Sequence, residues 1–550
     1  MITPPKKSSF VRTLEFVHKN IILIIIIIVV LASITSTIFI VRDNIIAKNN
    51  EENVTYEPVN TLHFSMSKIN TLNPLLSNDE DVYYITQLIY DGLFELDETL
   101  NVRPVLVSSY SVNSSEGNVS IKLKSDIRFH NDSKLTAYDV KYTVDAINAV
   151  GSKSLYYDYA SKIDYVQVRG NRSLKIYFSD PEDAALDNLV FPIVCSNQLG
   201  SPYDFASTTS YKPVGTGQYK YSSYNSLSRL KLKPNKDYFG DVATNKIQFE
   251  ILPDKEKSTN LMTMDSITAY YSDKSNIDTI AEDKNLKINK IMSNQVEYLA
   301  FNFDNINLSK NNVRLAIARA IDTKKILKDA YMGSGVLSDS IYYPNFLGSG
   351  NKGDEYAQNE NIAVGLLKQQ GYRDTNEDGF LEDVKGKKLE FSILVNENNL
   401  NRVDAAKLIA QNLNDVGIST HINKVSWNEY QALTEKSDFD ILIGGYSFEK
   451  KYDLRDFFNE NSFINYNNPK VLSLVNKLET AMSAEKYSKT YKELKEIMSK
   501  DLPYYSLCYK TGSLVTVQHF NFEKLPTFFN IYDNCDKWSW EKRIVVNPDK

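Results

Sequence analysis

An uninterrupted apolar run near the amino end most constrains what this chain can fold into. Residues 21–41 (IILIIIIIVVLASITSTIFIV) carry no charged side chain. At about 1.5 Å per helical residue the run reaches roughly 31 Å, enough to cross a hydrocarbon layer about 30 Å thick. The preceding residues 1–20 hold four Lys or Arg residues against one Glu. Because basic flanks stay on the cytoplasmic side, we expect a single-pass cell-membrane anchor with a cytoplasmic N-terminus and an extracytoplasmic body.

A cleaved signal peptide is the competing interpretation of this run. The apolar core of a signal peptide is usually about 7–15 residues long, and small residues follow it at the cleavage site. Here the run is longer, it ends in Ile38-Phe39-Ile40-Val41, and no nearby cysteine follows that could carry a lipid. We therefore expect an uncleaved anchor, joined to the body by an Asn-rich polar stalk over residues 42–56.

The remainder of the chain has the composition of a globular protein. The whole sequence has 42% hydrophobic and 24% charged residues and a net charge of -6. This length predicts two to four domains, and the absence of a basic excess argues against a nucleic-acid partner. The three cysteines are expected to be buried small apolar residues, with a Cys508–Cys535 disulfide as the alternative.

Hydrophobic periodicity predicts a mixed α and β body. A helix is expected over 82–93, a capping box from Thr136 to Asp139, and a hairpin turn at Gly170-Asn171. In the second half, a strand over 389–395, a helix and a returning strand form a βαβ unit with parallel strands.

The sequence carries no recognisable catalytic motif. Its five histidines are scattered without metal-ligand spacing. No nucleophile elbow, zinc-protease motif or phosphate-binding loop is present in the sequence. We therefore expect a protein that is not an enzyme and that uses no cofactor and no metal.

Seven short motifs follow one another from about residue 60 to the end of the chain. They are Leu72-Asn73-Pro74 with Tyr90-Asp91-Gly92-Leu93; Phe129-His130 with residues 135–140; residues 213–219; residues 234–240; Val313-Arg314-Leu315-Ala316 with Ala320-Ile321-Asp322; Leu366-Leu367 with Gly371-Tyr372; and Leu502-Pro503. In this order they resemble the extracytoplasmic solute-binding proteins of ABC importers, in the oligopeptide/dipeptide-binding family (family 5).

The resemblance implies a periplasmic-binding-protein-like fold of type II, with two lobes and an extra inserted domain, after the N-terminal transmembrane helix. Such lobes close over a ligand by hinge motion. The implied partners are a peptide or other small solute and ABC permease subunits, and the protein is expected to be a monomer. The implied domains are domain I over 57–105, 212–298 and 520–550, inserted domain II over 106–211, and domain III over 299–519.

The family normally pairs a buried carboxylate with the α-ammonium of the peptide, in a stretch that reads Trp, two residues, then Asp. The matching stretch here is Tyr446-Ser447-Phe448-Glu449. The resemblance therefore implies Glu449 as the acidic ligand residue and Tyr446 as the aromatic one. Both depart from the family pattern, and Lys450-Lys451 follow directly. A solvated charge cluster remains the alternative for Glu449.

Further ligand contacts are implied elsewhere. Asn78, Asp79 and Glu80 fall in the loop that brackets the ligand in oligopeptide binders, although capping of the next helix explains them equally well. Tyr156 matches a domain II tyrosine that faces the peptide backbone. Trp427 follows a strand and is a pocket candidate, with a core position as its alternative.

Other conspicuous residues are assigned structural roles. Gly215 and Gly217 flank a sharp bend, where glycine tolerates backbone angles that other residues avoid. Arg314 with Asp322 is expected to support the packing of a domain III helix. The Gly-Glu-x-Asp signature that the family commonly carries near residue 265 is missing, which leaves the ligand class more open than the fold.

The stretch from Asp374 to Gly379 resembles a calcium loop. The twelfth position of such a loop requires a bidentate Glu, and Lys385 stands there. Asp383 substitutes only in a loop of different shape. We therefore predict a turn without a metal at this place.

Taken together, these features predict a membrane-anchored extracytoplasmic substrate-binding protein of an ABC importer that binds peptides in an interlobe cleft by hinge closure. The alternative is a ligand-sensing or interaction protein that keeps the solute-binding fold but signals to a membrane partner.

Overall fold

The computed structural model describes residues 54–274, 277–282, 284–353, 355–448, 454–455, 457–459, 461–478 and 484–545. The predicted cytoplasmic tail, the anchor at 21–41, most of the stalk and Glu449 lie outside the described residues. Within the described part of the chain, no helix combines the length and apolar character that a membrane crossing requires.

The chain divides into two compact units, one of residues Met1–Val59 with Glu541–Lys550 and one of residues Asn60–Trp540. In the smaller unit, β1 (Val54–Val59) is the described strand at the amino end. The larger unit carries the other elements discussed below, together with the start of β20 (Ser539–Val545), which pairs with β19 (Phe520–Asn521) through Trp540 and Phe520.

The first sheet of the larger unit has the strand order β2-β11-β10-β9. Parallel pairing joins β2 and β11, and the other neighbours are antiparallel. Its buried face is aromatic: Phe64 lies 4.9 Å from Tyr532 and 6.0 Å from Trp538 between ring centroids. The strands are β2 (Thr61–Met66), β9 (Tyr219–Asn225), β10 (Arg229–Pro234) and β11 (Lys246–Ile251), with α7 (Ser258–Met262) following.

A second sheet, of order β5-β6-β8-β7, lies entirely within residues 107–178. The predicted hairpin at Gly170-Asn171 is confirmed by the antiparallel pairing of β7 and β8. The predicted cap of α4 is also present, because the Thr136 backbone N–H and Oγ1 both donate to Asp139 Oδ2 at 2.8 Å. The elements are β5 (Val107–Asn113), β6 (Asn118–Leu123), α4 (Ala137–Val150), β7 (Ile163–Gly170), β8 (Ser173–Phe178) and α6 (Pro202–Ser207).

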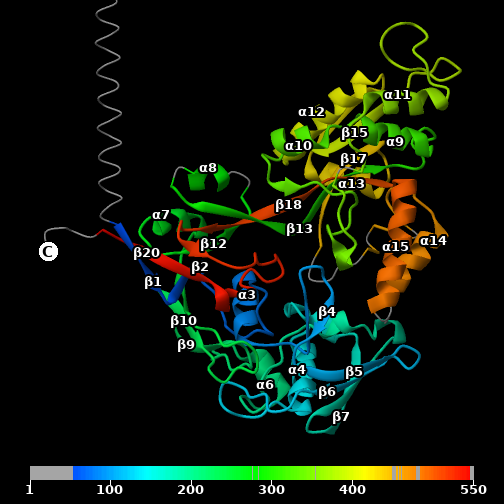
Figure 1. Ribbon diagram of the computed structural model, residues 1–550. Helices are drawn as coiled ribbons and strands as arrows, with labels where there is room; N and C mark the ends of the chain where they lie inside the picture. Colours follow the sequence, from blue (N-terminus) through cyan, green and yellow to red (C-terminus); the bar gives the residue numbers. More distant parts are fainter. Residues whose placement is uncertain are drawn as a thin grey trace, which may run out of the picture. The chain divides into compact units, whose positions relative to one another are not determined.

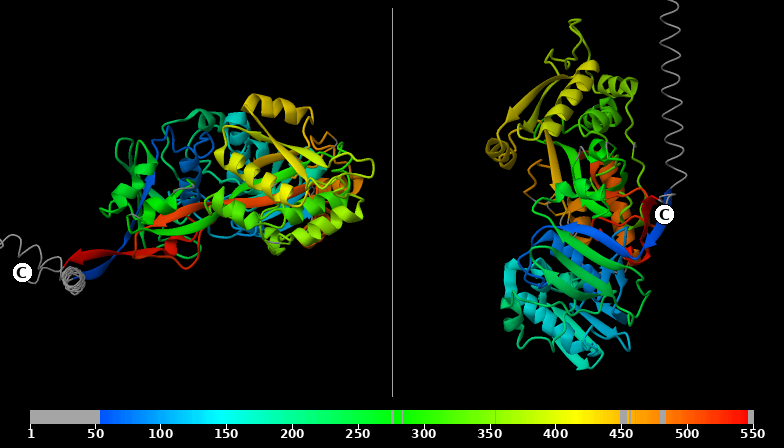
Figure 2. Two further views of the ribbon diagram at one scale, coloured as in Figure 1. Left: turned by 90° about the horizontal axis from the view of Figure 1, so that it is seen from above. Right: turned by 90° about the vertical axis from the view of Figure 1, so that its left-hand side faces the viewer.

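The largest sheet has the order β12-β18-β13-β17-β15-β16, with β14 beside β18. Two long strands, β13 (Lys287–Phe301) and β18 (Tyr504–Thr516), are paired along most of their length. They run from the region of β12 towards β15 and β17 and lie side by side in both orientations (Figures 1 and 2). The shorter strands are β12 (Ala269–Ser272), β14 (Gly335–Val336), β15 (Glu390–Asn396), β16 (Ser419–Val425) and β17 (Ile441–Ser447).

The predicted βαβ unit is confirmed. Strands β15 and β16 pair in parallel from Glu390↔Ser419 to Asn396↔Val425, and α12 (Leu400–Asp415) connects them. The strand residues are mostly buried on β15, as expected when helices cover a parallel pair. The other helices after α7 are α8 (Ile277–Glu282), α9 (Asn311–Ala320), α10 (Thr323–Asp329), α11 (Glu360–Gln369), α13 (Trp427–Glu435), α14 (Pro469–Leu478) and α15 (Ala484–Asp501).

Two predictions of local structure need correction. The helix expected over 82–93 is α3 (Glu80–Ile89), which ends because Tyr90 is extended at φ -123° and ψ 144°. Gly215 and Gly217 do not have positive φ angles. They are required by close approach, since a Cβ on Gly217 would lie 2.6 Å from Ile89 C and one on Gly215 would overlap the Ile89 carbonyl. This contact fixes the end of α3 against the chain at 215–217.

The predicted burial of the cysteines and the structural role of Arg314 are confirmed. Cys195, Cys508 and Cys535 are all buried and unbonded, so the Cys508–Cys535 disulfide is wrong. Arg314 is buried and donates to main-chain carbonyls of Leu308, Asp501 and Leu502. Asp322 does not pair with it and instead caps α10 by accepting from Lys325 N. The predicted domain boundaries stay predictions.

Candidate ligand-binding site

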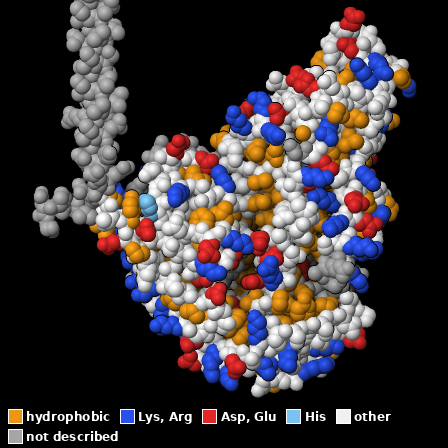
Figure 3. Space-filling view, in the orientation of Figure 1, with side chains coloured by type: hydrophobic (Ala, Val, Ile, Leu, Met, Phe, Trp, Pro, Cys, Tyr) orange, Lys and Arg blue, Asp and Glu red, His pale blue; other side chains and the backbone are white. Residues whose placement is uncertain are grey.

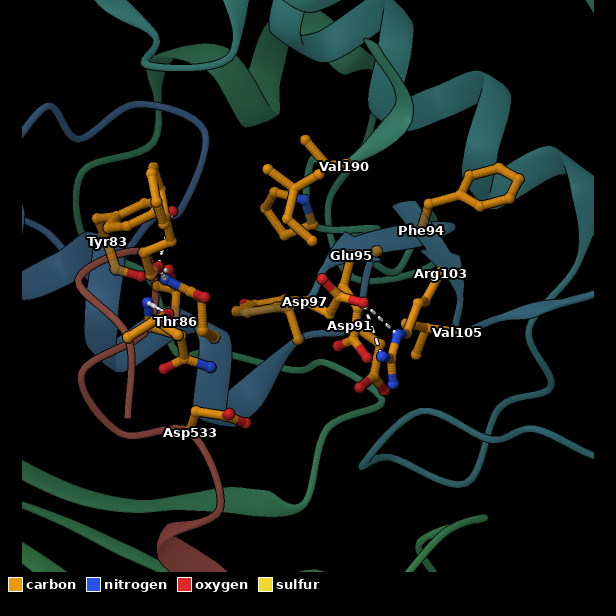
Figure 4. A pocket seen from close by; sticks show the side chains of 18 of the residues that line it. Tyr83, Thr86, Asp91, Phe94, Glu95, Asp97, Arg103, Val105, Val190 and Asp533 are labelled. Atoms are coloured by element: carbon orange, nitrogen blue, oxygen red, sulfur yellow. Dashed lines mark hydrogen bonds and ion pairs between the residues drawn. The ribbon is translucent and has the colours of Figure 1, made fainter. Parts of the chain in front are cut away.

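A cavity of about 280 Å³ lies among three segments that are far apart in sequence. The first is α3 with the turn into β3 (Phe94–Leu96) and β4 (Val102–Pro104). The second surrounds the short helix α5 (Tyr157–Ala160) and reaches Pro192, and the third is residues 524–534. The close-up shows Tyr83 and Thr86 on one side of this cavity and Glu95, Asp97 and Arg103 on the other (Figure 4).

Aromatic residues form much of the cavity wall. Tyr83 and Tyr90 come from α3 and its end, Tyr156 and Tyr159 from α5, and Phe529 from the third segment. Two side chains of α3 hold the third segment by its backbone, because Tyr83 OH and Gln87 Nε2 both donate to the main-chain carbonyl of Phe529, at 3.1 and 3.0 Å. The wall can therefore pack apolar groups of a ligand, and its position depends on α3.

Acidic residues also line the cavity. Five carboxylates line it against two cationic side chains: Asp91, Glu95, Asp97, Glu98 and Asp533 against Arg103 and Lys524. Each cation is already paired, since Arg103 Nε lies 2.7 Å from Asp97 Oδ2 and Lys524 Nζ lies 2.9 Å from Glu98 Oε2. The lining therefore holds three more negative groups than positive ones.

Two of the three remaining carboxylates accept from neutral donors, and the third, Glu95, faces solvent. Asp91 accepts from Thr216 Oγ1 at 2.7 Å and from Tyr238 OH at 3.1 Å. Asp533 accepts from the side-chain amide of its neighbour Asn534. Glu95 projects into the open recess, where its side chain remains exposed to solvent. Charged and hydrophobic side chains lie close together in the hollowed middle of the face shown in Figure 3.

This crowding changes the acidity of the carboxyl groups. Partial enclosure by the cavity walls raises the pKa of Glu95 to about 7, although its side chain still contacts solvent, and the negative charges of Asp533 and Asp91 add to the effect. Burial raises the pKa of Asp91 to about 6, although the Thr216 and Tyr238 hydroxyls oppose the change. Burial also raises the pKa of Asp533. Such a site favours the uptake of protons or of a cationic group.

One predicted ligand residue, Tyr156, lies in this cavity and is 4% exposed. Asn78 and Asp79 precede α3 and Glu80 is its first residue, and these three residues do not line the cavity. The capping interpretation of Asp79 is confirmed, since its side chain accepts from Asp81 N and Val82 N. A ligand role of these three residues stays a prediction.

The candidates from the second half of the chain lie elsewhere. Tyr446 ends β17 and packs edge-on against Phe448 and Phe457, at 4.8 and 4.9 Å between ring centroids. Trp427 begins α13, stacks on Tyr430 and is 44% exposed, so its core alternative is wrong. Neither lines the cavity, and both ligand roles stay predictions, as does that of Glu449.

Sequence reasoning missed the acidic lining of the cavity. Asp91 belongs to a motif that we used only to establish the resemblance. A dense acidic stretch, DGLFELDE over residues 91–98, directly follows α3 and was an available signal. Asp533 offered no such signal, because only the fold brings residues 524–534 to α3.

Comparison with known proteins agrees with this fold. A profile of the bacterial extracellular solute-binding proteins, family 5, matches residues 101–467. The oligopeptide-binding protein AppA of Bacillus subtilis is 25% identical over 501 residues, which cover 86% of this chain and 90% of AppA. The glutathione-binding protein GsiB of Pectobacterium atrosepticum is 23% identical and covers 85% of this chain and 91% of its own.

Solved structures share the architecture. AppA in complex with a nonapeptide has a TM-score of 0.54 and 23% identity, with 89% of this chain and 100% of AppA covered. The unliganded open form of the murein tripeptide binding protein MppA reaches 0.74 at 16% identity, with 88% and 99% covered. From the profile match over two thirds of its length, this chain belongs to the family 5 bacterial extracellular solute-binding proteins.

Proposed function

We propose that this protein is the extracytoplasmic substrate-binding subunit of an ABC importer and that its ligands are peptides with a free amino terminus. The observation that carries the proposal is the excess of three carboxylates, Asp91, Glu95 and Asp533, in an aromatic-walled cavity. A relative that matches most of the chain is named for oligopeptide binding.

The chemistry of the cavity suits an α-ammonium group. Two of its carboxyl groups have pKa values raised to about 6 and 7 in the absence of a cation. A bound ammonium would supply the missing positive charge, and the aromatic wall would accept the adjacent side chain. Partly desolvated charges interact strongly with a well-placed partner and poorly with a neutral one. The site should therefore discriminate against peptides whose amino terminus is blocked.

Capture of the remainder of the ligand is proposed to follow the mode of the family. Peptide backbone groups pair with protein backbone as an added strand, which gives affinity with little sequence preference. The lobes then close by hinge motion and bury the ligand. Glu449, with Tyr446, is retained as a second acidic candidate, and mutagenesis distinguishes it from Glu95.

The apolar run at 21–41 is proposed to anchor the protein to the cell membrane with its body outside. Tethering raises the effective concentration of a receptor near its permease. Resistance of the full chain to carbonate extraction, with an intact mass that includes residues 1–41, is the expected result. A mature protein that begins after residue 41 and is released would overturn the anchor.

Binding is tested on the full chain in detergent micelles by isothermal titration with short peptides. We expect binding of free peptides and at least tenfold weaker binding of their N-acetylated forms. Glu95→Gln should weaken the binding of the free peptide at least tenfold. The control variant Glu496→Gln, on the exposed face of α15, should leave this binding unchanged. Equal affinity for free and acetylated peptides would remove the ammonium assignment. Binding of a metal complex or a sugar, without binding of any peptide, would show that peptides are not the ligands.

Import is distinguished from ligand sensing by the membrane partner. Crosslinking of the anchored protein in its own membrane should recover permease subunits in a ligand-dependent manner. Recovery of a sensor kinase in their place would establish the alternative.

A further inference from the structure

The loop between α11 and β15 holds an acidic group that the binding pocket does not use. Asp374, Asp378 and Glu382 each offer one carboxylate oxygen, and these oxygens all lie within 4.8 Å of one another. Oxygens no farther apart than this can all contact one ion at about 2.4 Å, which is a calcium–oxygen distance. Asp374 and Asp378 are exposed, whereas Glu382 is 3% exposed.

Glu382 distinguishes this group from an ordinary acidic turn. Its Oε2 accepts from Thr375 N and Oγ1, at 2.9 and 2.8 Å. Its Oε1 is buried and has no hydrogen-bond partner in the structure. A buried acceptor without a partner costs free energy, and more so when it carries charge. Thr375 therefore holds the carboxylate in place while one of its oxygens lacks a ligand.

We propose that this loop binds one divalent cation, with Ca²⁺ preferred. In a calcium loop that begins at Asp374, the ligands of positions 1, 3 and 5 are Asp374, Asn376 and Asp378, and position 6 is Gly379 at φ 88°. The backbone carbonyl of Phe380 takes position 7, and Glu382 takes position 9. Glu382 replaces the missing acid at position 12, where Lys385 stands.

Two other features bear on the sequence prediction of a turn without metal. Asp383, the substitute ligand considered there, is occupied otherwise, because its Oδ1 accepts from the backbone of Lys385 and Lys387. The Lys388 ammonium lies 2.8 Å from Asp378 Oδ2 and over the Phe380 ring. It supplies one positive charge against three carboxylates, so the group retains two negative charges, which matches a divalent cation.

Binding would link two parts of the fold. Leu381 N donates to Gly417 O at 2.8 Å. The backbone of Glu382 forms isolated antiparallel β-bridges with the backbones of Arg373 and Lys388. The cation would therefore hold the loop against the turn that follows α12, ahead of β15 and β16. Oxygen sites that serve in extracellular modules bind calcium with dissociation constants of about 0.1–1 mM.

The test uses the full chain in detergent, stripped with a chelator and dialysed against ⁴⁵Ca²⁺, with Mg²⁺ as the competing ion. We expect one Ca²⁺ to be bound in the millimolar range or tighter, little displacement by equimolar Mg²⁺, and a thermal midpoint that rises by a few degrees. Asp374→Asn and Asp378→Asn retain the oxygen that accepts the loop N–H and should weaken binding at least tenfold. Asp404→Asn on the exposed face of α12 is the matched control and should leave binding unchanged.

Lys388→Met separates a calcium site from a loop that uses lysine as its cation. Removal of a competing ammonium should tighten Ca²⁺ binding several-fold. The proposal would be overturned if no Ca²⁺ is bound at 5 mM or if both Asp variants bind Ca²⁺ as wild type does. Weaker Ca²⁺ binding by Lys388→Met would also overturn it. None of these outcomes depends on the peptide pocket.

Discussion

Arg402 on α12 and Glu297 on β13 form a buried two-point ion pair, with Nε to Oε2 at 2.8 Å and Nη2 to Oε1 at 3.2 Å. Their side chains are 12% and 5% exposed. Tyr331 OH also donates to Glu297 Oε2, at 3.3 Å. Gly445 on β17 leaves room for the pair, because a Cβ there would overlap the Arg402 guanidinium. The pair thus joins α12 to β13, and β17 passes close beside it at Gly445.

Removal of one partner should be costly. Glu297→Ala leaves the Arg402 guanidinium buried without its carboxylate, and we expect the free energy of unfolding to fall by about 3–5 kcal/mol. Urea denaturation measures this change. The double variant Glu297→Gln with Arg402→Met, which removes both charges at similar volume, should lose less than the sum of its single variants. The control is the exposed pair Lys407–Asp404 on the same helix, where Lys407→Ala should cost under about 1 kcal/mol.

The pocket predicts a pH dependence of stability without ligand. Glu95 has an ordinary pKa of 4.5 and a folded-state pKa of about 7, so between these values the folded protein holds a proton that the unfolded chain has lost. Its contribution is therefore present at pH 4.5 and is lost as the pH rises to 7. Glu95→Gln should gain stability over wild type as the pH rises through this window. The side chain contacts solvent, so screening keeps the gain at pH 8 to about 1 kcal/mol.

The same carboxyl group should make peptide binding pH-dependent. An ammonium group favours ionised Glu95, so affinity should rise from about pH 5.5 to about pH 7, and binding near pH 6.5 should release protons. Titration calorimetry in two buffers of different ionisation enthalpy measures the protons released. Release that is unchanged in Glu95→Gln would show that another group titrates.

The close approach at Gly217 gives a fourth prediction. In Gly217→Ala the new Cβ would lie 2.6 Å from Ile89 C and 2.7 Å from Leu88 O, which are backbone atoms that cannot rotate away. We expect a loss of about 1–3 kcal/mol in the free energy of unfolding and weaker peptide binding, because α3 carries one wall of the pocket. Gly365→Ala in α11 is the control: its Cβ meets nothing within 4 Å, and a gain of about 0.5–1 kcal/mol is expected.

The contacts of Arg314 give a fifth prediction. Its Nε donates to Asp501 O at 3.0 Å and its Nη1 to Leu308 O at 2.6 Å, while its guanidinium lies 4.3 Å from the Phe303 ring centroid. Lysine carries one compact donor group and cannot reproduce this spread of donors. Arg314→Lys should therefore lower the free energy of unfolding by about 1–3 kcal/mol, as measured by urea denaturation. An unchanged midpoint and slope would show that the carbonyls find other donors.

Local patterns were the part of the fold that the sequence predicted well. The Thr136–Asp139 cap, the hairpin at Gly170-Asn171 and the βαβ unit each depend on residues within about forty positions of one another. Their periodicity and turn chemistry were sufficient. The helix predicted over 82–93 ran past its true end because Gly92 is packed against the main chain at Phe94 and Phe191, which its apolar periodicity does not reveal.

Contacts between distant segments escaped prediction. The acidic lining of the pocket combines residues 91–98 with Asp533, and no periodicity in either stretch points to the other. Tyr156 was found only through the resemblance. The free Oε1 of Glu382 depends on how Thr375 holds the carboxylate, which spacing alone does not specify.

The pocket takes its third wall, with Phe529 and Asp533, from the last thirty or so residues of the chain. A nascent or truncated polypeptide that stops before residue 520 can complete the βαβ unit and the α11–β15 loop, yet it lacks this wall of the cavity. The proposed site is thus the part of the molecule that synthesis completes last.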